Sequence, residues 1–231
     1  MKHIKMPLRK IAGSLMVGAF LAGSAYAAPP LQVREISTST GAQSGSLQLP
    51  VNPSGPQNYF AGFQNIEVQW GSSPSSTFQA LCIDPAQYSS TSFSYYDAPN
   101  PATFFASLGA GKAAEITTLF NHGFAGTAGN SQNAAAFQLA LWEIANDDGN
   151  LNTGLVKVNT NTASWLVTGA QALLNAQVNP SAPSLYNFTI YQSQAKQDFI
   201  VATPVPEPGT YAMFLAGLGL MGVIARRRSA S

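Results

Sequence analysis

The stretch SQNAAAFQLALWEIAND at residues 131–147 sets the fold of the chain, because it carries the clearest helical pattern in the sequence. It is rich in Ala and Leu, and Asn130 or Ser131 is a natural N-cap before it. Gln138 is unusual within it, since it lies among apolar residues and shares a helix face with Trp142. A buried amide lowers stability unless it finds several hydrogen-bond partners.

Alternating or apolar segments on both sides of this helix predict strands. We expect them at 65–70, 77–84, 91–96, 184–192 and 198–202, with one or two weak strands within 28–56. Two more helices are expected at 112–121 and about 163–177. Strands, then helices, then strands predict an α+β fold, a β-sandwich or barrel with a helical insertion.

The charge of the chain is uneven. The formal net charge is +1, but seven of the eleven basic residues lie at the two ends. Residues 28–205 hold four basic and nine acidic residues, which leaves a net charge of −5. Without a basic patch, nucleic acid is excluded as a partner.

The first 27 residues have the pattern of a secretory signal peptide. A basic start with Lys2, Lys5, Arg9 and Lys10 precedes an apolar run at 11–22. The small residues of Ala-Tyr-Ala at 25–27 then predict cleavage by signal peptidase between Ala27 and Ala28. We therefore expect an exported protein.

The tail combines three features in a fixed order. A Pro206-Glu207-Pro208 tripeptide comes first, an apolar segment at 211–225 follows, and Arg226, Arg227 and Arg228 come last. Such an apolar segment with a basic end is a stop-transfer signal, here shorter than a full span. The arrangement resembles the PEP-CTERM sorting signal, which implies a membrane-anchored intermediate and removal of the tail by an exosortase. The expected organisation is a signal peptide at 1–27, an exported module at 28–203 and a sorting signal at 204–231.

Cys82 is the single cysteine of the chain and lies in the apolar stretch FQALCIDP at 78–85. In an oxidising compartment structural cysteines come in pairs, so a lone one is a buried thiol, an intermolecular link or a reactive group. The bland interpretation makes Cys82 a small buried hydrophobe and Gln138 a hydrogen-bonded core amide.

Two segments resemble the Cys–Gln thioester domains of bacterial surface adhesins: Leu81-Cys82-Ile83-Asp84 and Gln138-Leu139-Ala140-Leu141-Trp142. The resemblance implies an internal thioester between the Cys82 sulfur and the Gln138 side-chain carbonyl. Its expected environment is Asp84, Phe137, Leu141 and Trp142, whose apolar members would exclude water. The sequence departs from the family at Phe137, where a small polar residue is usual. An amine- or hydroxyl-bearing surface ligand is the implied partner.

Other chemistry has weaker support in the sequence. His122 is the one histidine after the signal peptide, but no protease motif surrounds Cys82, so we do not expect an enzyme. The segment 147–152 alternates carboxylates and amides as a calcium loop does, yet a helix stop and polar turn is the favoured interpretation. Glu143 is expected to be solvated or paired. No cofactor and no metal are predicted.

Two functions follow from these expectations. The first is an adhesive cell-surface or extracellular-matrix protein that captures its partner covalently. The alternative is a non-reactive structural component of the exopolysaccharide or biofilm matrix. Both place the mature protein outside the cell.

Overall fold

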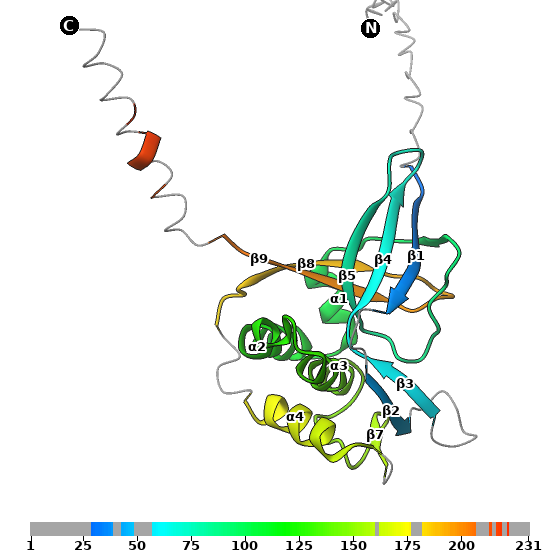
Figure 1. Cartoon of the computed structure of the whole chain (residues 1–231), viewed down its shortest axis with the longest axis vertical. Coiled ribbons are helices and arrows are strands. Elements are labelled where there is room, and N and C mark those ends of the chain that lie inside the picture. Colours follow the sequence, from blue (N-terminus) through cyan, green and yellow to red (C-terminus); the bar gives the residue numbers. More distant parts are fainter. Residues whose placement is uncertain are drawn as a thin grey trace, which may run out of the picture.

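The computed structural model describes residues 29–38, 43–48, 57–159, 162–176, 182–206, 213, 216–218 and 221. In this part of the chain the strands come first and last, with a block of helices between them (Figure 1). The strands are β1 (Leu31–Thr38), β2 (Gln43–Gln48), β3 (Gln57–Ala61), β4 (Gln64–Trp70), β5 (Ser76–Cys82), β6 (Ser94–Tyr96), β7 (Lys157–Val158), β8 (Tyr186–Tyr191) and β9 (Phe199–Pro204). The helices are α1 (Pro101–Leu108), α2 (Lys112–Gly123), the 3₁₀ turn η1 (Phe124–Thr127), α3 (Ser131–Asn146) and α4 (Ser164–Asn175).

The larger sheet has six antiparallel strands in the order β6-β1-β4-β5-β9-β8. It bends at β5, because Ser76–Ala80 pair with β4 whereas Leu81 and Cys82 pair with β9. In Figure 1, β8 and β9 accordingly run across the direction of β1, β4 and β5. The edge strands meet at a single bridge between Asp97 and Gln192.

This curled sheet confirms a mixed fold with strands on either side of the helices. It curls toward a barrel rather than forming the two face-to-face sheets of a sandwich, because the bend at β5 brings β8 round to β6. Alternation builds its interior, since Ile66 and Val68 of β4 are buried while Glu67 between them is partly exposed. On the outer face, Glu67 forms a salt bridge with Arg34 of the neighbouring strand at 2.6 Å.

The helices form the second half of the molecule with α3 at their centre. α3 contacts α2, α4 and η1 as well as β2, β3 and β5. A smaller sheet in the order β3-β2-β7 lies beside this block (Figure 1). All residues from Ala134 to Ala145 are buried, so the helix is enclosed on every side.

Most predicted elements are present, with shifted ends. The helix expected at 131–147 is α3, capped by the Asn130 side chain, which accepts from the Asn133 N–H at 3.0 Å. The strand expected to reach Asp84 ends at Cys82, because Ile83 and Asp84 leave the ladder. α1 and β3 were not predicted.

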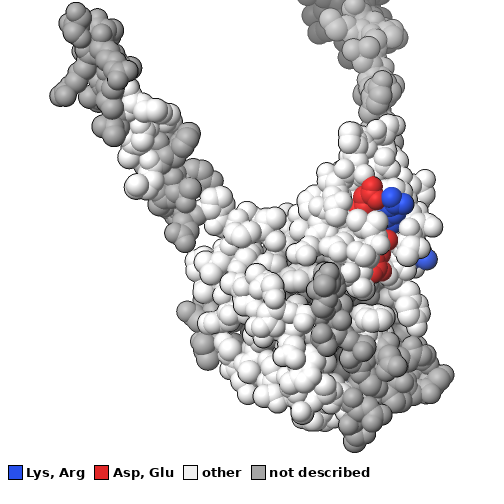
Figure 2. Space-filling model, viewed as in Figure 1, with Lys and Arg blue, Asp and Glu red and all other residues white. Residues whose placement is uncertain are grey.

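Charged side chains are sparse on the surface. On the face in Figure 2 they gather in one small patch over the strands of the larger sheet, and the remaining described surface on that face is uncharged. The described part of this face has no extended basic region of the kind that binds nucleic acid.

The two predicted targeting ends fall almost entirely outside the described residues. Ala27, Ala28, Glu207, Pro208 and the three terminal arginines are among those not described, as is most of 211–225. Among the described residues, no helix has the length and apolar composition needed to cross a bilayer.

Candidate functional site

Cys82 and Gln138 meet where the curled sheet touches the helices. Cys82 is the last residue of β5, and Gln138 lies near the middle of α3. Their exposed fractions are 1% and 0%, so both are inside the protein.

Two reciprocal hydrogen bonds join these residues, and we call the pair the Gln138 clamp. The Cys82 backbone N–H donates to Gln138 Oε1 at 3.0 Å, and Gln138 Nε2 donates to the Cys82 carbonyl oxygen at 2.6 Å. The contact predicted between this strand and this helix is therefore present. A bond between sulfur and side-chain carbonyl stays a prediction.

The position of the clamp follows from the topology of the sheet. The pairing of β4 with β5 ends at Gln64 and Ala80, two residues before Cys82. The Cys82 backbone groups on that side therefore have no strand partner, and the Gln138 amide takes the place of one. A buried N–H or C=O without a partner lowers stability by about 1–3 kcal/mol. The clamp avoids this loss at Cys82, which lies beyond the end of the pairing with β4.

The environment of the Cys82 sulfur favours the neutral thiol. Burial is the main cause that raises the pKa of the Cys82 thiol well above its ordinary value, and the carboxylates of Asp84 and Asp198 act in the same direction. The indole N–H of Trp142 opposes this shift in pKa, although it makes no hydrogen bond of normal geometry. The thiol donates to the backbone carbonyl of Asp84 at 3.2 Å.

The apolar residues predicted around the site are all buried: Phe137, Leu141 and Trp142. Phe137 packs edge-on against Phe120 at 5.0 Å and against Phe124 at 5.7 Å between ring centroids. These contacts tie α3 to α2 and η1. The aromatic ring therefore has a packing role that a small polar residue at this position could not fill.

A pocket of about 280 Å³ is lined in part by Trp142. Among the described residues, four buried polar side-chain atoms have no hydrogen-bond partner, and three of them belong to residues that line this pocket. They are Gln64 Oε1, Gln197 Oε1 and Trp142 Nε1. Trp142 thus lines the pocket and also acts on the pKa of the Cys82 thiol.

His122 is not part of this site. It is exposed in the last turn of α2, whereas Cys82 is buried, and no hydrogen bond joins the two among the described residues. Asp198 is a nearby residue that the sequence interpretation missed as a site residue. It is 7% exposed, accepts from the Ser193 N–H at 2.7 Å, and burial raises the pKa of Asp198 to about 6.

Glu143 was expected to be solvated or paired; it is not solvated, and only its Oε1 is paired, with the Gly149 N–H at 3.1 Å. Glu143 is 0% exposed, and its Oε2 is the fourth unpartnered polar atom. Its ligand atoms lie within 4.8 Å of those of Asp147 and Asp148. The segment 147–152 is thus part of a larger acidic group that includes a buried helical residue.

The end of β9 leads into the tail. β9 ends at Pro204, and Pro206 is exposed directly after it. Residues 204–229 match the PEP-CTERM protein-sorting motif. This motif implies an exported protein that is processed by an exosortase.

Comparison with solved structures finds similar folds at low sequence identity. The N-terminal domain of the Streptococcus pyogenes pilus tip adhesin Cpa is 15% identical with a TM-score of 0.45, over 79% of this chain and 97% of that one. The N-terminal thioester domain of a surface protein from Clostridium perfringens is 14% identical with a TM-score of 0.45, over 70% and 98%. A cysteine-to-alanine variant of that domain gives a TM-score of 0.42 at 14% identity, over 69% and 99%. A search of curated proteins found no match.

Proposed function

We propose that this chain is an exported protein in which Cys82 and Gln138 form an internal thioester for covalent capture of a partner at the cell surface or in the extracellular matrix. The observation that carries the proposal is the Gln138 clamp, which holds the amide against the residue that bears the only thiol of the chain. The PEP-CTERM motif supports the extracellular location.

Formation of the thioester needs no outside reagent. The Cys82 sulfur attacks the Gln138 side-chain carbonyl carbon, the C–S bond forms, and the C–N bond breaks. The amide nitrogen leaves as ammonia with the thiol proton. The Cys82 backbone N–H already points at Gln138 Oε1, the oxygen on which negative charge develops during the attack.

Burial would protect the bond until a partner arrives. A thioester is an activated acyl group, and Leu141 and Trp142 enclose it in a part of the core that excludes water. An amine or hydroxyl of the partner then attacks the same carbon, the C–S bond breaks, and Cys82 recovers a proton. Gln138 is left joined to the partner by an amide or ester.

The pocket beside Trp142 is the entry route in this proposal. Two unpaired carbonyl oxygens, of Gln64 and Gln197, belong to its lining, and so does the carboxylate residue Glu35. These groups suit a ligand that brings hydrogen-bond donors, such as a primary amine or a carbohydrate hydroxyl. Movement of the Trp142 side chain would connect the pocket with the site.

The intact mass of the purified protein tests the proposal. The wild type should be lighter than its sequence mass by one ammonia, and Cys82→Ala and Gln138→Ala should each restore the full mass. Gln79→Ala is the matched control, because Gln79 is an exposed glutamine on the same strand as Cys82. Treatment with methylamine should add one amine to Gln138 of the wild type and free the thiol for alkylation. A folded wild type with its full sequence mass and a freely alkylated thiol in the unfolded state would overturn the thioester.

A second candidate is the non-reactive structural component. It is favoured by the fact that both polar atoms of the Gln138 amide already have partners in the clamp. In that case the wild type keeps its full mass, and Gln138 serves only to join β5 to α3. The same mass measurement separates the two candidates.

Processing is tested by sequencing the ends of the protein from its native host. We expect a mature chain that starts near Ala28 and ends close to 206–209. A chain at the outer surface that still carries Arg226, Arg227 and Arg228 would contradict cleavage of the tail.

A further inference from the structure

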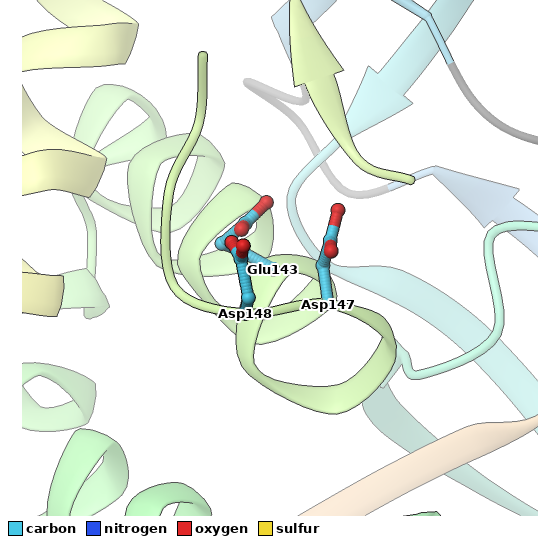
Figure 3. A group of neighbouring side chains, drawn as sticks. All are labelled: Glu143, Asp147 and Asp148. Atoms are coloured by element: carbon cyan, nitrogen blue, oxygen red, sulfur yellow. The ribbon is translucent and has the colours of Figure 1, made fainter. Parts of the chain in front are cut away.

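Three carboxylates gather where α3 ends: Glu143 from the last turns of the helix and Asp147 and Asp148 directly after it (Figure 3). One oxygen of each lies within 4.8 Å of the others. Oxygens around a single cation are spaced at such distances, because cation–oxygen bonds of calcium are about 2.3–2.6 Å long.

Each carboxylate is held by backbone N–H groups through one oxygen. Glu143 Oε1 accepts from Gly149 at 3.1 Å, Asp147 Oδ2 from Val156 at 2.7 Å and also from Leu155, and Asp148 Oδ1 from Asn150 at 3.0 Å. The other oxygen of Glu143 has no hydrogen-bond partner in the described part of the chain. For Glu143 this free oxygen, Oε2, is completely buried. A buried charged oxygen without a partner is costly, so this oxygen requires a ligand or a proton.

The local negative charges are only partly compensated. The C-terminal end of α3 carries the negative pole of the helix dipole and has no basic residue in its last turn. Within the described residues, no Lys, Arg or His lies within 4.0 Å of the three carboxylates. Lys112 is the cation nearby, but its Nζ donates to the Asp147 carbonyl at 2.6 Å and pairs with Glu115 at 3.4 Å.

The titration of Glu143 reflects this surplus of negative charge. Burial raises the pKa of Glu143 to about 7, repulsion by Asp147 and Asp148 adds to the rise, and the N–H groups of Asn150 and Gly149 oppose it.

We propose that Glu143, Asp147 and Asp148 bind a calcium ion that fixes the end of α3 to the following loop. The available ligands are oxygens without nitrogen or sulfur, which selects a hard cation. The ligands come from a helix end and an irregular loop. Calcium accepts such flexible geometry, whereas magnesium demands a near-ideal octahedron. We expect a dissociation constant of about 0.1–1 mM, the range of extracellular calcium modules.

The ion would act on the element that carries Gln138. The loop 147–156 returns two buried side chains, Leu151 and Val156, to the core against α3. Binding at its base joins the loop to the helix, five residues after Gln138 in the sequence. Calcium would thus stabilise the framework of the clamp without touching Cys82.

Thermal unfolding of the purified protein, first freed of metal by a chelator, tests the proposal. A tenfold excess of calcium over its dissociation constant should raise the melting temperature by about 3–6 °C, and magnesium should do much less. Glu143→Gln keeps the acceptor for the Gly149 N–H but removes the charge, and exposed Asp148→Asn changes no buried group; both should lose the shift. Glu115→Gln, a neighbouring carboxylate outside the cluster, should keep it.

Terbium luminescence gives a readout that does not depend on stability. Trp142 immediately precedes Glu143, so excitation of the indole should sensitise a terbium ion in the site, and calcium should displace it. Wild-type protein with no calcium-dependent shift up to 10 mM and no displaceable terbium signal would overturn the proposal. An equal signal in Asp148→Asn and Glu143→Gln would do so as well.

Discussion

Gln138 and Glu143 are the two polar side chains in the buried body of α3, and they differ in how their needs are met. The Gln138 amide exchanges two hydrogen bonds with the Cys82 backbone. Glu143 is equally buried but has one oxygen without a partner. A neutral group can be satisfied by fixed backbone alone, whereas a carboxylate beside two others depends on something that the chain does not supply. The stabilising contribution of Gln138 is therefore set by the fold alone, whereas that of Glu143 depends on pH and on bound cations.

The largest effect is expected from Gln138→Leu. It leaves the buried N–H and C=O of Cys82 without partners, so its free energy of unfolding should lie about 2–5 kcal/mol below that of Cys82→Ala, in which the Gln138 amide is intact and no thioester forms. Urea unfolding measures this change. Cys82→Ala removes any thioester but keeps the clamp, and exposed Gln132→Leu on the same helix controls for the substitution itself. If Gln138→Leu is as stable as Cys82→Ala, the clamp contributes nothing.

The second effect is a gain of stability in Glu143→Gln without calcium. The folded pKa of Glu143 is raised from 4.5 to about 7, so the folded protein binds the proton more tightly than the unfolded chain does. Stability is therefore complete below about pH 4.5 and falls as the pH rises toward 7. At pH 8 in chelator the variant should exceed the wild type by about 2–3 kcal/mol, and near pH 4.5 the difference should vanish. Asp198, whose pKa is raised to about 6, also makes stability fall as the pH rises. Its effect is the same in the variant and the wild type, so it cancels in the difference between them.

Denaturant titrations at several pH values provide the comparison. The charged groups that face Glu143 are Asp147 and Asp148, with Lys112 and Glu115 beside them. Saturating calcium should remove the pH dependence in the wild type only. A variant that is destabilised equally at both pH values would show that Glu143 acts through packing rather than charge.

A smaller effect on stability is expected from Asn146→Ala. Asn146 is the last residue of α3, between the Gln138 clamp and the acidic cluster. The Asn146 Nδ2 donates to the Ile83 carbonyl at 3.1 Å and to the Trp142 carbonyl at 3.0 Å, so it extends the contact between β5 and α3 beyond the clamp. Its loss should cost about 1 kcal/mol in urea unfolding. Exposed Asn175→Ala on α4 should change stability by less than about 0.5 kcal/mol. An equal loss of stability in Asn146→Ala and Asn175→Ala would refute the role of Asn146 in the contact between β5 and α3.

The smallest effect concerns calcium affinity in Lys112→Gln. Removal of a positive charge beside the cluster should tighten binding about twofold, because the repulsion between Lys112 and the ion is screened by solvent. Calorimetric titration measures the dissociation constant, and Lys196→Gln in the β8–β9 connection is the control. Weaker binding in Lys112→Gln would mean that the lysine supports the loop more than it repels the ion.

The sequence was sufficient to predict α3 and its contact with β5. The Ala/Leu pattern predicted the helix. The resemblance of their two segments to thioester domains, with Cys82 and Gln138 each anomalous alone, indicated that these residues meet. The burial of Glu143 also had a signal that was not used. From Ala134 to Ala145 the helix has no polar face, which is typical of a helix enclosed on all sides, so Glu143 had to be buried with it.

Other features could not be predicted because they depend on context. Prolines such as Pro99 and Pro101 usually favour a break in regular structure. Pro101 nevertheless starts α1, where a missing N–H is harmless and the Asn100 side chain accepts from the Ala102 N–H at 2.9 Å. The bend of the sheet at β5 depends on which strand reaches Cys82, and pairing between distant strands leaves no mark in either one.

The pairing of β9 has a mechanical consequence. Phe199 at its start lies beside Cys82, and the strand is bonded to β8 along its whole length, from Tyr191 to Tyr186. In a protein held from its C-terminal side with a partner attached at Gln138, tension would run lengthwise along β9. All hydrogen bonds between β8 and β9 would then bear the force together, in shear, instead of breaking one by one. This strand pair can therefore resist force applied between an anchored C-terminal side and a captured ligand.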